Sequence, residues 1–401
     1  MKKLISALLI VVASTFYLSA QNTNYQNLTH EDFASYSYWT EMMKDPTVNF
    51  YETQEAFEIY FENRETGKGT GYKQFSRWAA FMEPRVFPSG ERFAHDQLWN
   101  EMMAFNKNNA SLPENLRSTW EELGPKTSLN NTGHWSPGIG RINVICLAPD
   151  DPQTIYIGAP SGGLWKTTDE GENWECLTDD LPVIGVSAIA IDYTDPDIIY
   201  IGTGDKDASD TYSIGILKSY DGGQTWETTD IDWTIYQNRT IAKLLIHPTE
   251  PNTLFAATTN GFYKTTDGGD NWDRTQNGDI DDMEFKPGNP DIIYANTKKL
   301  YISIDGGENF TQSPASLPTS YRVQIAVTDA NPEYIYFLSS RDGVYRSEDS
   351  GQTFTKKSTS PVPGNQDWYD LSFAASHTNP EEIHPESSTP IVHTMVALVG
   401  L

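Results

Sequence analysis

Short apolar runs separated by turn-forming residues recur from about residue 140 to about residue 375, a pattern typical of β-strands. Five of these runs follow an x-Pro turn, and the steps between the prolines are 44, 55, 39 and 42 residues; the prolines are Pro152, Pro196, Pro251, Pro290 and Pro332. Repeats of this length are typical of the four-stranded blades of a β-propeller. The pattern therefore predicts a mainly β fold, a β-propeller with about five complete blades.

The same pattern predicts the strands within each repeat. In the first repeat they fall at 142–147, 154–158, 163–167 and 174–177. First strands of later repeats are predicted at 187–191, 241–246, 282–285 and 323–327, and 370–373 would open a sixth blade. After Ile383 the repeat pattern stops. Because a propeller closes by pairing its last blade with its first, we expect the chain to be a fragment, or to have an altered end, of a longer protein.

One eight-residue turn recurs five times between predicted third and fourth strands, at 167–174, 219–226, 265–272, 303–310 and 347–354. Each copy has serine or threonine first, aspartate third, glycine fifth, and tryptophan or phenylalanine eighth. A short carboxylate in such a turn folds back onto backbone amides, and glycine supplies a left-handed backbone conformation. The aromatic residue is expected to pack into the sheet. We therefore predict a structural role for the five aspartates, Asp169, Asp221, Asp267, Asp305 and Asp349.

Residues 21–110 lack the repeat and show aromatic side chains at helical spacing instead. One helix is predicted from Asn49 to about residue 64, a second from Tyr72 until Pro84 ends it, and a third over 91–105. We interpret the aromatic stripe as a face that packs on the propeller; a groove for a partner is the alternative. The predicted divisions are 1–20 (signal peptide), 21–110 (helical region), 111–123 (linker), 124–384 (propeller) and 385–401 (divergent tail).

The net charge of −27 in 401 residues limits the kinds of partner. So acidic a chain repels phosphate backbones and anionic lipid, which argues against nucleic acid and membrane surfaces. Lys2 and Lys3 followed by an apolar run over 4–17 indicate a secretory signal peptide. A membrane anchor is the alternative, but the run is shorter than the roughly 20 residues that span a bilayer. We predict a secreted or cell-surface protein without an integral membrane segment in its mature chain.

Two cysteines in an exported chain suggest a disulfide between Cys146 and Cys176. These residues fall on the first and fourth predicted strands of one blade, which lie about 14 Å apart at about 4.8 Å per strand. Because a disulfide needs Cα atoms within about 7 Å, two buried free thiols are predicted instead.

Strand order places the eight-residue turns on one face of the propeller and the loops between second and third strands on the other. The second face contains a longer loop at 203–213, in which Asp205, Asp207 and Asp210 are close in sequence. A solvated acidic loop is the ordinary interpretation; a Ca²⁺ site is the alternative, although the ligand pattern of an EF-hand is missing. The sequence indicates no other cofactor. Further candidates on this face could contact a peptide or stack on sugar rings, namely Trp135, Arg141, Trp233, Tyr236, Arg239, Tyr321, Arg322 and Trp368.

The repeated turns resemble the Asp-boxes of bacterial neuraminidase-repeat (BNR) and sortilin-type propellers, and the resemblance covers residues 124–384. The resemblance implies the propeller fold. It does not identify the function, because sialidases, xyloglucanases, photosynthetic assembly factors and sorting receptors all carry such repeats. The N-terminal part, with NFY at 49–51 and WAAFMEPR at 78–85, is similar to leader regions of large surface proteins exported by type IX secretion.

A glycoside hydrolase usually needs two carboxyl groups about 5 to 9.5 Å apart, and Asp205 and Asp207 are candidates by position alone. The xyloglucanase-like motif has an aspartate just before its Gly-Gly-aromatic strand, but residues 159–165 (APSGGLW) contain no carboxylate. The sialidase-like Arg-Ile-Pro motif departs here at Asn143. We therefore predict a non-catalytic module that binds protein or polysaccharide at the cell surface. The alternatives are a glycoside hydrolase whose catalytic set is incomplete in this chain, and a purely structural surface component.

Overall fold

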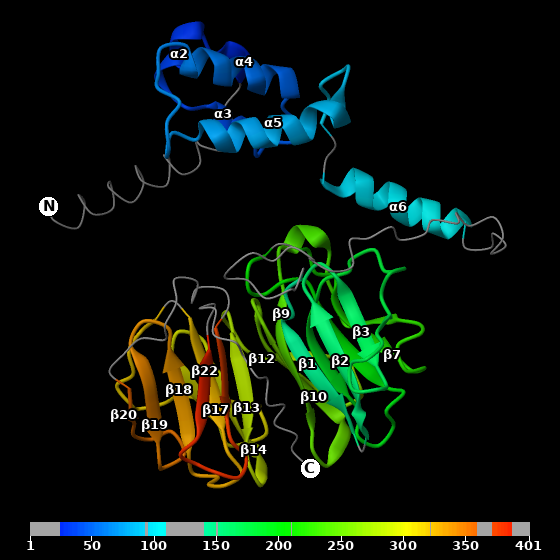
Figure 1. Cartoon of the computed structure of the whole chain (residues 1–401), viewed down its shortest axis with the longest axis vertical. Coiled ribbons are helices and arrows are strands. Elements are labelled where there is room, and N and C mark those ends of the chain that lie inside the picture. Colours follow the sequence, from blue (N-terminus) through cyan, green and yellow to red (C-terminus); the bar gives the residue numbers. More distant parts are fainter. Residues whose placement is uncertain are drawn as a thin grey trace, which may run out of the picture. The chain divides into compact units, whose positions relative to one another are not determined.

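The computed structural model of the chain describes residues 25–92, 95–109, 140–149, 151–209, 211–320, 322–358 and 371–386. They belong to two compact units, residues 1–111 and 112–401, each with its own hydrophobic core (Figure 1). The predicted signal peptide, the predicted linker and most of the predicted tail lie outside the described residues. In the part of the chain that the structure describes, no helix combines the length and apolar character needed to cross a membrane.

The first unit is a group of helices built around aromatic side chains. Its helices are η1 (Tyr25–Asn27), α2 (His30–Ser35), α3 (Trp39–Met42), α4 (Phe50–Phe61), α5 (Tyr72–Val86) and α6 (His95–Asn109). Phe57 of α4 stacks on Phe75 of α5 with ring centroids 3.8 Å apart, and Trp39 of α3 meets both rings edge-on. The prediction that the stripe of α4 packs on the propeller is therefore wrong for Phe57, because α3 and α5 already bury it.

Pro84 does not end α5, which continues to Val86. Proline lacks an N–H and so removes one hydrogen bond from the last turn, but the two residues after it still belong to the helix. Arg92 then ties the segment after α5 to the end of α3, because its guanidinium donates to the carbonyl oxygens of Met42, Met43 and Asp45 at 2.6 to 2.8 Å.

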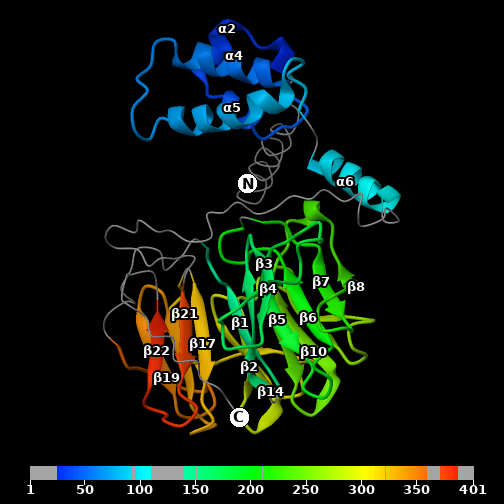
Figure 2. The same cartoon turned by 45° about the vertical axis from the view of Figure 1, so that its right-hand side comes forward.

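The second unit is mainly β and propeller-like, with antiparallel sheets whose strands follow chain order (Figure 2). Among the described residues it has five four-stranded sheets and one two-stranded sheet. The first three sheets are β1–β4 (Val144–Ala148, Asp151–Ala159, Gly163–Thr167, Glu175–Cys176), β5–β8 (Val186–Ile191, Ile199–Thr203, Gly215–Ser219, Glu227–Asp232) and β9–β12 (Ile241–His247, Glu250–Thr258, Gly261–Thr265, Asp273–Gln276). The others are β13–β16 (Asp282–Lys286, Asn289–Asn296, Leu300–Ser303, Thr311–Gln312), β17–β20 (Val323–Val327, Ile335–Ser339, Gly343–Ser347, Thr355–Lys356) and β21–β22 (Ser372–Ala375, Ile383–Glu386). A 3₁₀ turn, η3 (Ile235–Gln237), connects β8 to β9.

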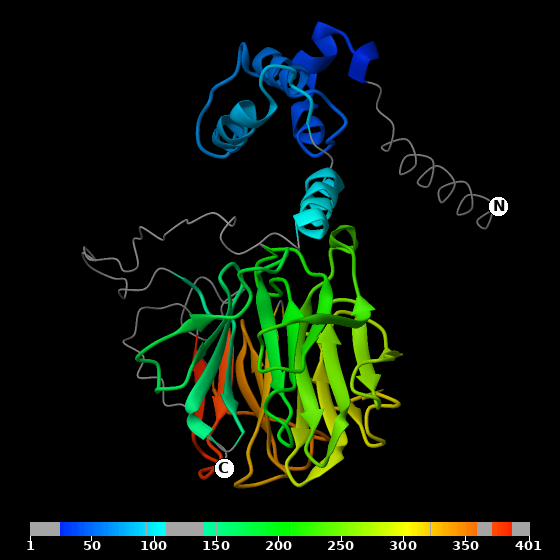
Figure 3. The same ribbon diagram turned by 90° about the vertical axis from the view of Figure 1, so that its right-hand side faces the viewer.

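The strands lie close to their predicted positions. β3 and β17 have the predicted bounds, while β1 and β21 each begin two residues later than predicted. Neighbouring sheets pack face to face, so that all six residues of β5 are buried. The first strand of each sheet is innermost, because β1, β5, β9, β13, β17 and β21 all line one central space. Figure 3 shows the sheets of the second unit from another side.

The repeated eight-residue turns join the third strand of each four-stranded sheet to the fourth. Asp267 accepts hydrogen bonds from the side-chain amide of Asn271 at 2.8 Å, the hydroxyl of Thr265 at 2.7 Å and the backbone N–H of Asn271 at 3.0 Å. These bonds lower the pKa of Asp267 to about 2. Gly269, at φ 97°, has the left-handed conformation predicted for the fifth position. The bond to the backbone N–H of the seventh residue recurs at Asp169, Asp221, Asp305 and Asp349.

Two features of these turns were not predicted from the sequence. The seventh residue supplies both a backbone and a side-chain donor to the aspartate, and it is asparagine or threonine in all five copies: Asn173, Thr225, Asn271, Asn309 and Thr353. The aromatic eighth residue is buried at Trp272, but Trp174 is 38% exposed.

Cys146 and Cys176 are both free, as predicted from their places on the first and last strands of one sheet. They are partly rather than fully buried. Burial raises the pKa of the Cys146 thiol to about 12.

Candidate functional site

A pocket of about 1250 Å³ lies between the innermost strands of the second unit, and we call it the axial pocket. All six sheets line it with their first strands, through residues that include Ile145, Ser187, Lys243, Glu284, Gln324 and Ser372. Small-molecule pockets are typically about 300 to 1,000 Å³. The axial pocket therefore has room for an oligomeric ligand.

The mouth of the axial pocket lies on the face opposite the eight-residue turns. Its rim contains residues of loops between second and third strands, at 206, 207, 209, 259 and 297–299, and of connections between sheets, at 277–279, 319 and 322. In an antiparallel sheet these segments lie at the other end from the turn between the third and fourth strands. The pocket thus opens on the face that strand order assigns to the candidate ligand residues, away from the five turn aspartates.

The β6–β7 loop begins at a buried carboxylate on this rim. Asp205 is 0% exposed and accepts hydrogen bonds from the guanidinium of Arg141 at 2.5 Å and the side-chain amide of Asn143 at 3.1 Å. Both donors precede β1, so the loop of the second sheet is fastened to the first sheet. The interpretation as a solvated loop is wrong at Asp205, because a carboxylate can be buried where a cation and an amide replace its water.

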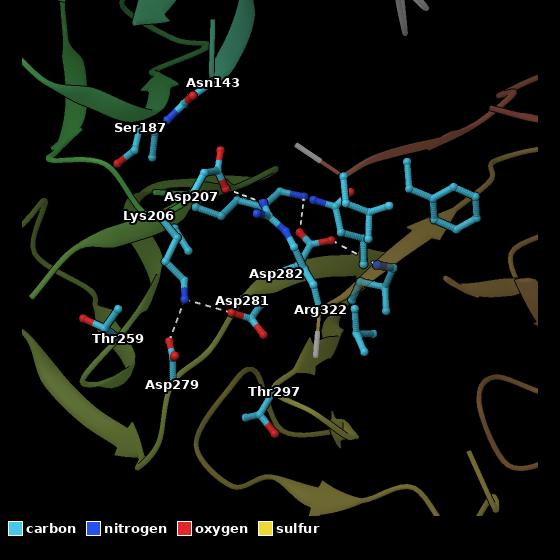
Figure 4. Close-up of a pocket in the computed structure, with 18 of the residues that line it drawn as sticks. Asn143, Ser187, Lys206, Asp207, Thr259, Asp279, Asp281, Asp282, Thr297 and Arg322 are labelled. Carbon is cyan, nitrogen blue, oxygen red and sulfur yellow. Dashed lines mark hydrogen bonds and ion pairs between the residues drawn. The ribbon is translucent and has the colours of Figure 1, made fainter. Parts of the chain in front are cut away.

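Lys206 and Asp207 reach other parts of the rim (Figure 4). The Nζ of Lys206 lies 2.8 Å from carboxylate oxygens of both Asp279 and Asp281, in the connection that enters β13. Asp207 forms an ion pair with Arg322, which directly precedes β17. Burial disfavours the charge on Lys206, but Asp281 and Asp279 outweigh it and raise its pKa. Burial also raises the pKa of Asp281, with Lys206 opposing the rise.

A second lysine connects two inner strands deeper in the wall. The Nζ of Lys243, on β9, lies 2.9 Å from Asp282 and 2.6 Å from Glu284, both on β13. Asp282 also accepts a hydrogen bond from the backbone N–H of Ile325 on β17 at 3.1 Å, and so links three sheets. Burial raises the pKa of Glu284, again with the lysine opposing the rise. The wall therefore holds carboxyl groups whose neutral form is favoured by burial, close to ammonium groups.

The remaining predicted face residues have different surroundings. Tyr236, on η3, is 54% exposed. Trp233 is only 6% exposed, within the core between the second and third sheets, so its predicted exposure is wrong. Burial of so large an apolar ring is strongly favourable. The guanidinium of Arg239 lies 5.6 Å from the Trp233 ring. Four candidates lie outside the described residues: Trp135, Asp210, Tyr321 and Trp368.

The sequence analysis does not identify Lys243, Asp281, Asp282 or Glu284 as site residues. A signal for Asp282 and Glu284 exists in the segment DMEFK at 282–286, where charged residues alternate along a predicted inner strand. Such alternation indicates that one side of the strand faces a polar space.

Among the residues that the structure describes, no three His, Cys, Asp or Glu side chains are grouped so that they could hold a metal ion. The Ca²⁺ alternative for the 203–213 loop stays a prediction, because Asp210 is not among those residues.

No model of a known protein family matches the chain. Its curated relatives include a xyloglucanase of Paenibacillus sp., 27% identical over 245 residues that form 58% of this chain and 22% of the relative. Xyloglucanase Xgh74A of Acetivibrio thermocellus is 26% identical over 232 residues, or 54% of this chain and 25% of the relative. The chain thus spans about a quarter or less of the length of these relatives. Among solved structures, the GH74 xyloglucanase from Xanthomonas campestris aligns with a TM-score of 0.48 at 17% identity, over 61% of this chain and 41% of that one.

Proposed function

We propose that this chain is the propeller part of a secreted glycoside hydrolase of the xyloglucanase type, and that the axial pocket holds the polysaccharide. The observation that carries the proposal is the group of partly buried carboxyl groups on and before β13, in a chain whose curated relatives are xyloglucanases. This function takes the place of the binding module predicted from the sequence.

Cleavage of a glycosidic bond needs one carboxyl group in its neutral form, to protonate the leaving oxygen, and a second that is ionised. Asp281 and Glu284 are the candidates for the acid, since burial raises the pKa of each. Asp207, in its ion pair with Arg322, is the candidate for the ionised group. The lysines of the wall would donate hydrogen bonds to sugar hydroxyls.

The test is reducing-sugar release together with calorimetric binding on the secreted chain, with xyloglucan, unsubstituted β-1,4-glucan and xylan as ligands. We expect xyloglucan to be bound and cleaved. Glu284→Gln or Asp281→Asn should lower turnover by about 10² to 10⁴ while binding remains, because loss of a general acid has effects of that size. Glu308→Gln is the matched control, since Glu308 pairs with Lys264 at 2.6 Å in an eight-residue turn on the opposite face. Turnover at the parent rate in both pocket variants would remove these two residues from the mechanism.

A second candidate is polysaccharide binding without cleavage. Two observations favour it. Each of the six carboxylates that the structure describes on the rim and wall has a cationic partner. Residues 159–165 lack the carboxylate of the xyloglucanase-like motif. Calorimetric binding of xyloglucan with no reducing sugar released would select this function over hydrolysis. Absence of binding to all three polysaccharides would exclude both.

A further inference from the structure

The β6–β7 loop crosses the axial pocket instead of lying beside it, and we call its residues 204–209 the strap. Sheets follow one another around the pocket in chain order, so the second sheet has the first and third as neighbours. Lys206 nevertheless reaches Asp281, at the entrance to the fourth sheet, and Asp207 reaches Arg322, at the entrance to the fifth. Contacts with sheets that are not neighbours require the strap to pass over the central space (Figure 4).

The backbone of the strap holds its charged side chains in fixed directions. The backbone N–H of Asp207 donates to the Asp205 carboxylate at 3.1 Å, and that of Ser209 donates to the Asp205 carbonyl at 3.0 Å. Gly204 begins the strap at φ 98°, where a Cβ would also lie 2.9 Å from the Cβ of Ser213. The strap is therefore a preformed turn rather than an extended loop.

The four ion pairs of the strap differ in burial. Asp205 is fully buried, and separating it from Arg141 would leave a buried charge without compensation. Lys206 is 15% exposed, and its partners Asp279 and Asp281 are 59% and 23% exposed. Asp207 and its partner Arg322 are only 19% and 17% exposed. Pairs with an exposed partner are weaker and are screened by salt. Of these attachments, the Lys206–Asp279 pair is therefore the one that opens most easily, and Asp205 is the firmest.

We propose that the strap is an ionic closure of the axial pocket, in which Asp205 is the permanent anchor and Lys206, with its exposed partner Asp279, is the main latch that releases when a polymeric ligand enters. The inference rests on the proposed function in assigning a glycan to the pocket. The closure itself can be measured without any glycan.

The measurement is the rate at which a maleimide of disaccharide size labels a reporter thiol in the pocket. Gln324→Cys provides the thiol, because Gln324 lines the pocket from β17. Cys146 and Cys176 are replaced by alanine in every variant. Lys206→Met opens the main latch. Lys264→Met is its control, because Lys264 is also 15% exposed and pairs with a 57% exposed carboxylate, but on the opposite face.

We expect labelling to be about tenfold faster in Lys206→Met than in the parent. Loss of the Lys206 ion pairs lowers the free-energy difference between the closed and open states, and a modest decrease raises a small open population by about that factor. Raising the salt from about 0.05 M to about 1 M should accelerate the parent and change Lys206→Met little. Lys206→Arg should restore slow labelling, and Lys264→Met should label like the parent. Asp279→Asn, which alters only an exposed side chain, should give a smaller acceleration and tests the closure if Lys206→Met fails to fold.

Equal labelling rates in the parent, Lys206→Met and Asp279→Asn, at both salt concentrations, would overturn the closure. In a separate experiment, xyloglucan oligosaccharide is added to test whether it slows maleimide labelling of the reporter thiol. Absence of protection would count against the proposed function and leave the closure standing, so the two failures can be told apart.

Discussion

The ammonium group of Lys243 on β9 lies 2.6 Å from the carboxylate of Glu284 on β13, across the boundary between the third and fourth sheets. The same ammonium lies 2.9 Å from Asp282. One lysine therefore compensates two carboxylates in the wall of the axial pocket, and its partners outweigh the effect of burial and raise its pKa.

Lys243→Met should therefore lower the free energy of unfolding by about 2 to 3 kcal/mol, since it leaves two carboxylates that are only 11% and 26% exposed without their cation, which is less than the full cost for a buried pair. Lys286→Met is the control, because Lys286 pairs with Glu333, whose side chain is 54% exposed, and such pairs contribute at most about 1 kcal/mol. Urea unfolding of both variants gives the comparison. Equal losses would mean that the wall of the pocket is effectively solvated.

Asp267→Ala should cost about 1 to 2 kcal/mol, because three donors in the turn lose their common acceptor. The neighbouring Asp270 is exposed in the same turn, and Asp270→Ala should change stability by less than about 0.5 kcal/mol. Thermal and urea unfolding both report the difference. An unchanged unfolding midpoint in Asp267→Ala would contradict the structural role of this aspartate.

The free energy of unfolding should fall on acidification over a pH range that the pKa values of the turn aspartates set. Hydrogen bonds, first of all those from the seventh residue's side chain, lower the pKa of Asp169, Asp221, Asp267 and Asp305 to about 2. An unfolded aspartate has a pKa of about 3.9, so these groups bind protons more readily in the unfolded chain. Their contribution is complete above about pH 4 and is lost as the pH falls towards about 2. The urea midpoint measured between pH 5 and pH 2 should follow this course, and it should fall less steeply in Asp267→Asn.

Gly215→Ala should be much more damaging than Gly288→Ala, although both glycines have left-handed backbones, at φ 95° and 76°. A Cβ at Gly215 would lie 1.8 Å from the carbonyl oxygen of Ile231 in the paired strand, whereas nothing lies within 4 Å at Gly288. We expect a loss of at least about 3 kcal/mol for the first and about 1 to 2 kcal/mol, from backbone strain alone, for the second. Comparable melting temperatures for the two variants would show that the β7–β8 pairing is looser than described.

Features that depend on near neighbours in the chain could be predicted from the sequence. Asp267 bonds to residues two to four positions away, so the turn at 265–272 is visible in a single repeat. The strands β3 and β17 were predictable because period-two patterning and bounding turns act over a few residues. The same reasoning placed the 203–213 loop on the face opposite the turns.

The candidate site depends on contacts that no local pattern contains. Asp205 and Arg141 are 64 residues apart, and Asp207 and Arg322 are 115 residues apart. Sequence analysis identified all four, but their pairing and the burial of Asp205 follow from how the sheets are arranged around one axis. Lys243, Asp282 and Glu284 form a cluster for the same reason, since β9 and β13 become neighbours only when consecutive sheets pack. The sequence by itself determined the repeats, the turns and the side of the sheets that carries the longer loop; tertiary structure alone decided which charges are buried, because burial and pairing depend on distances between blades.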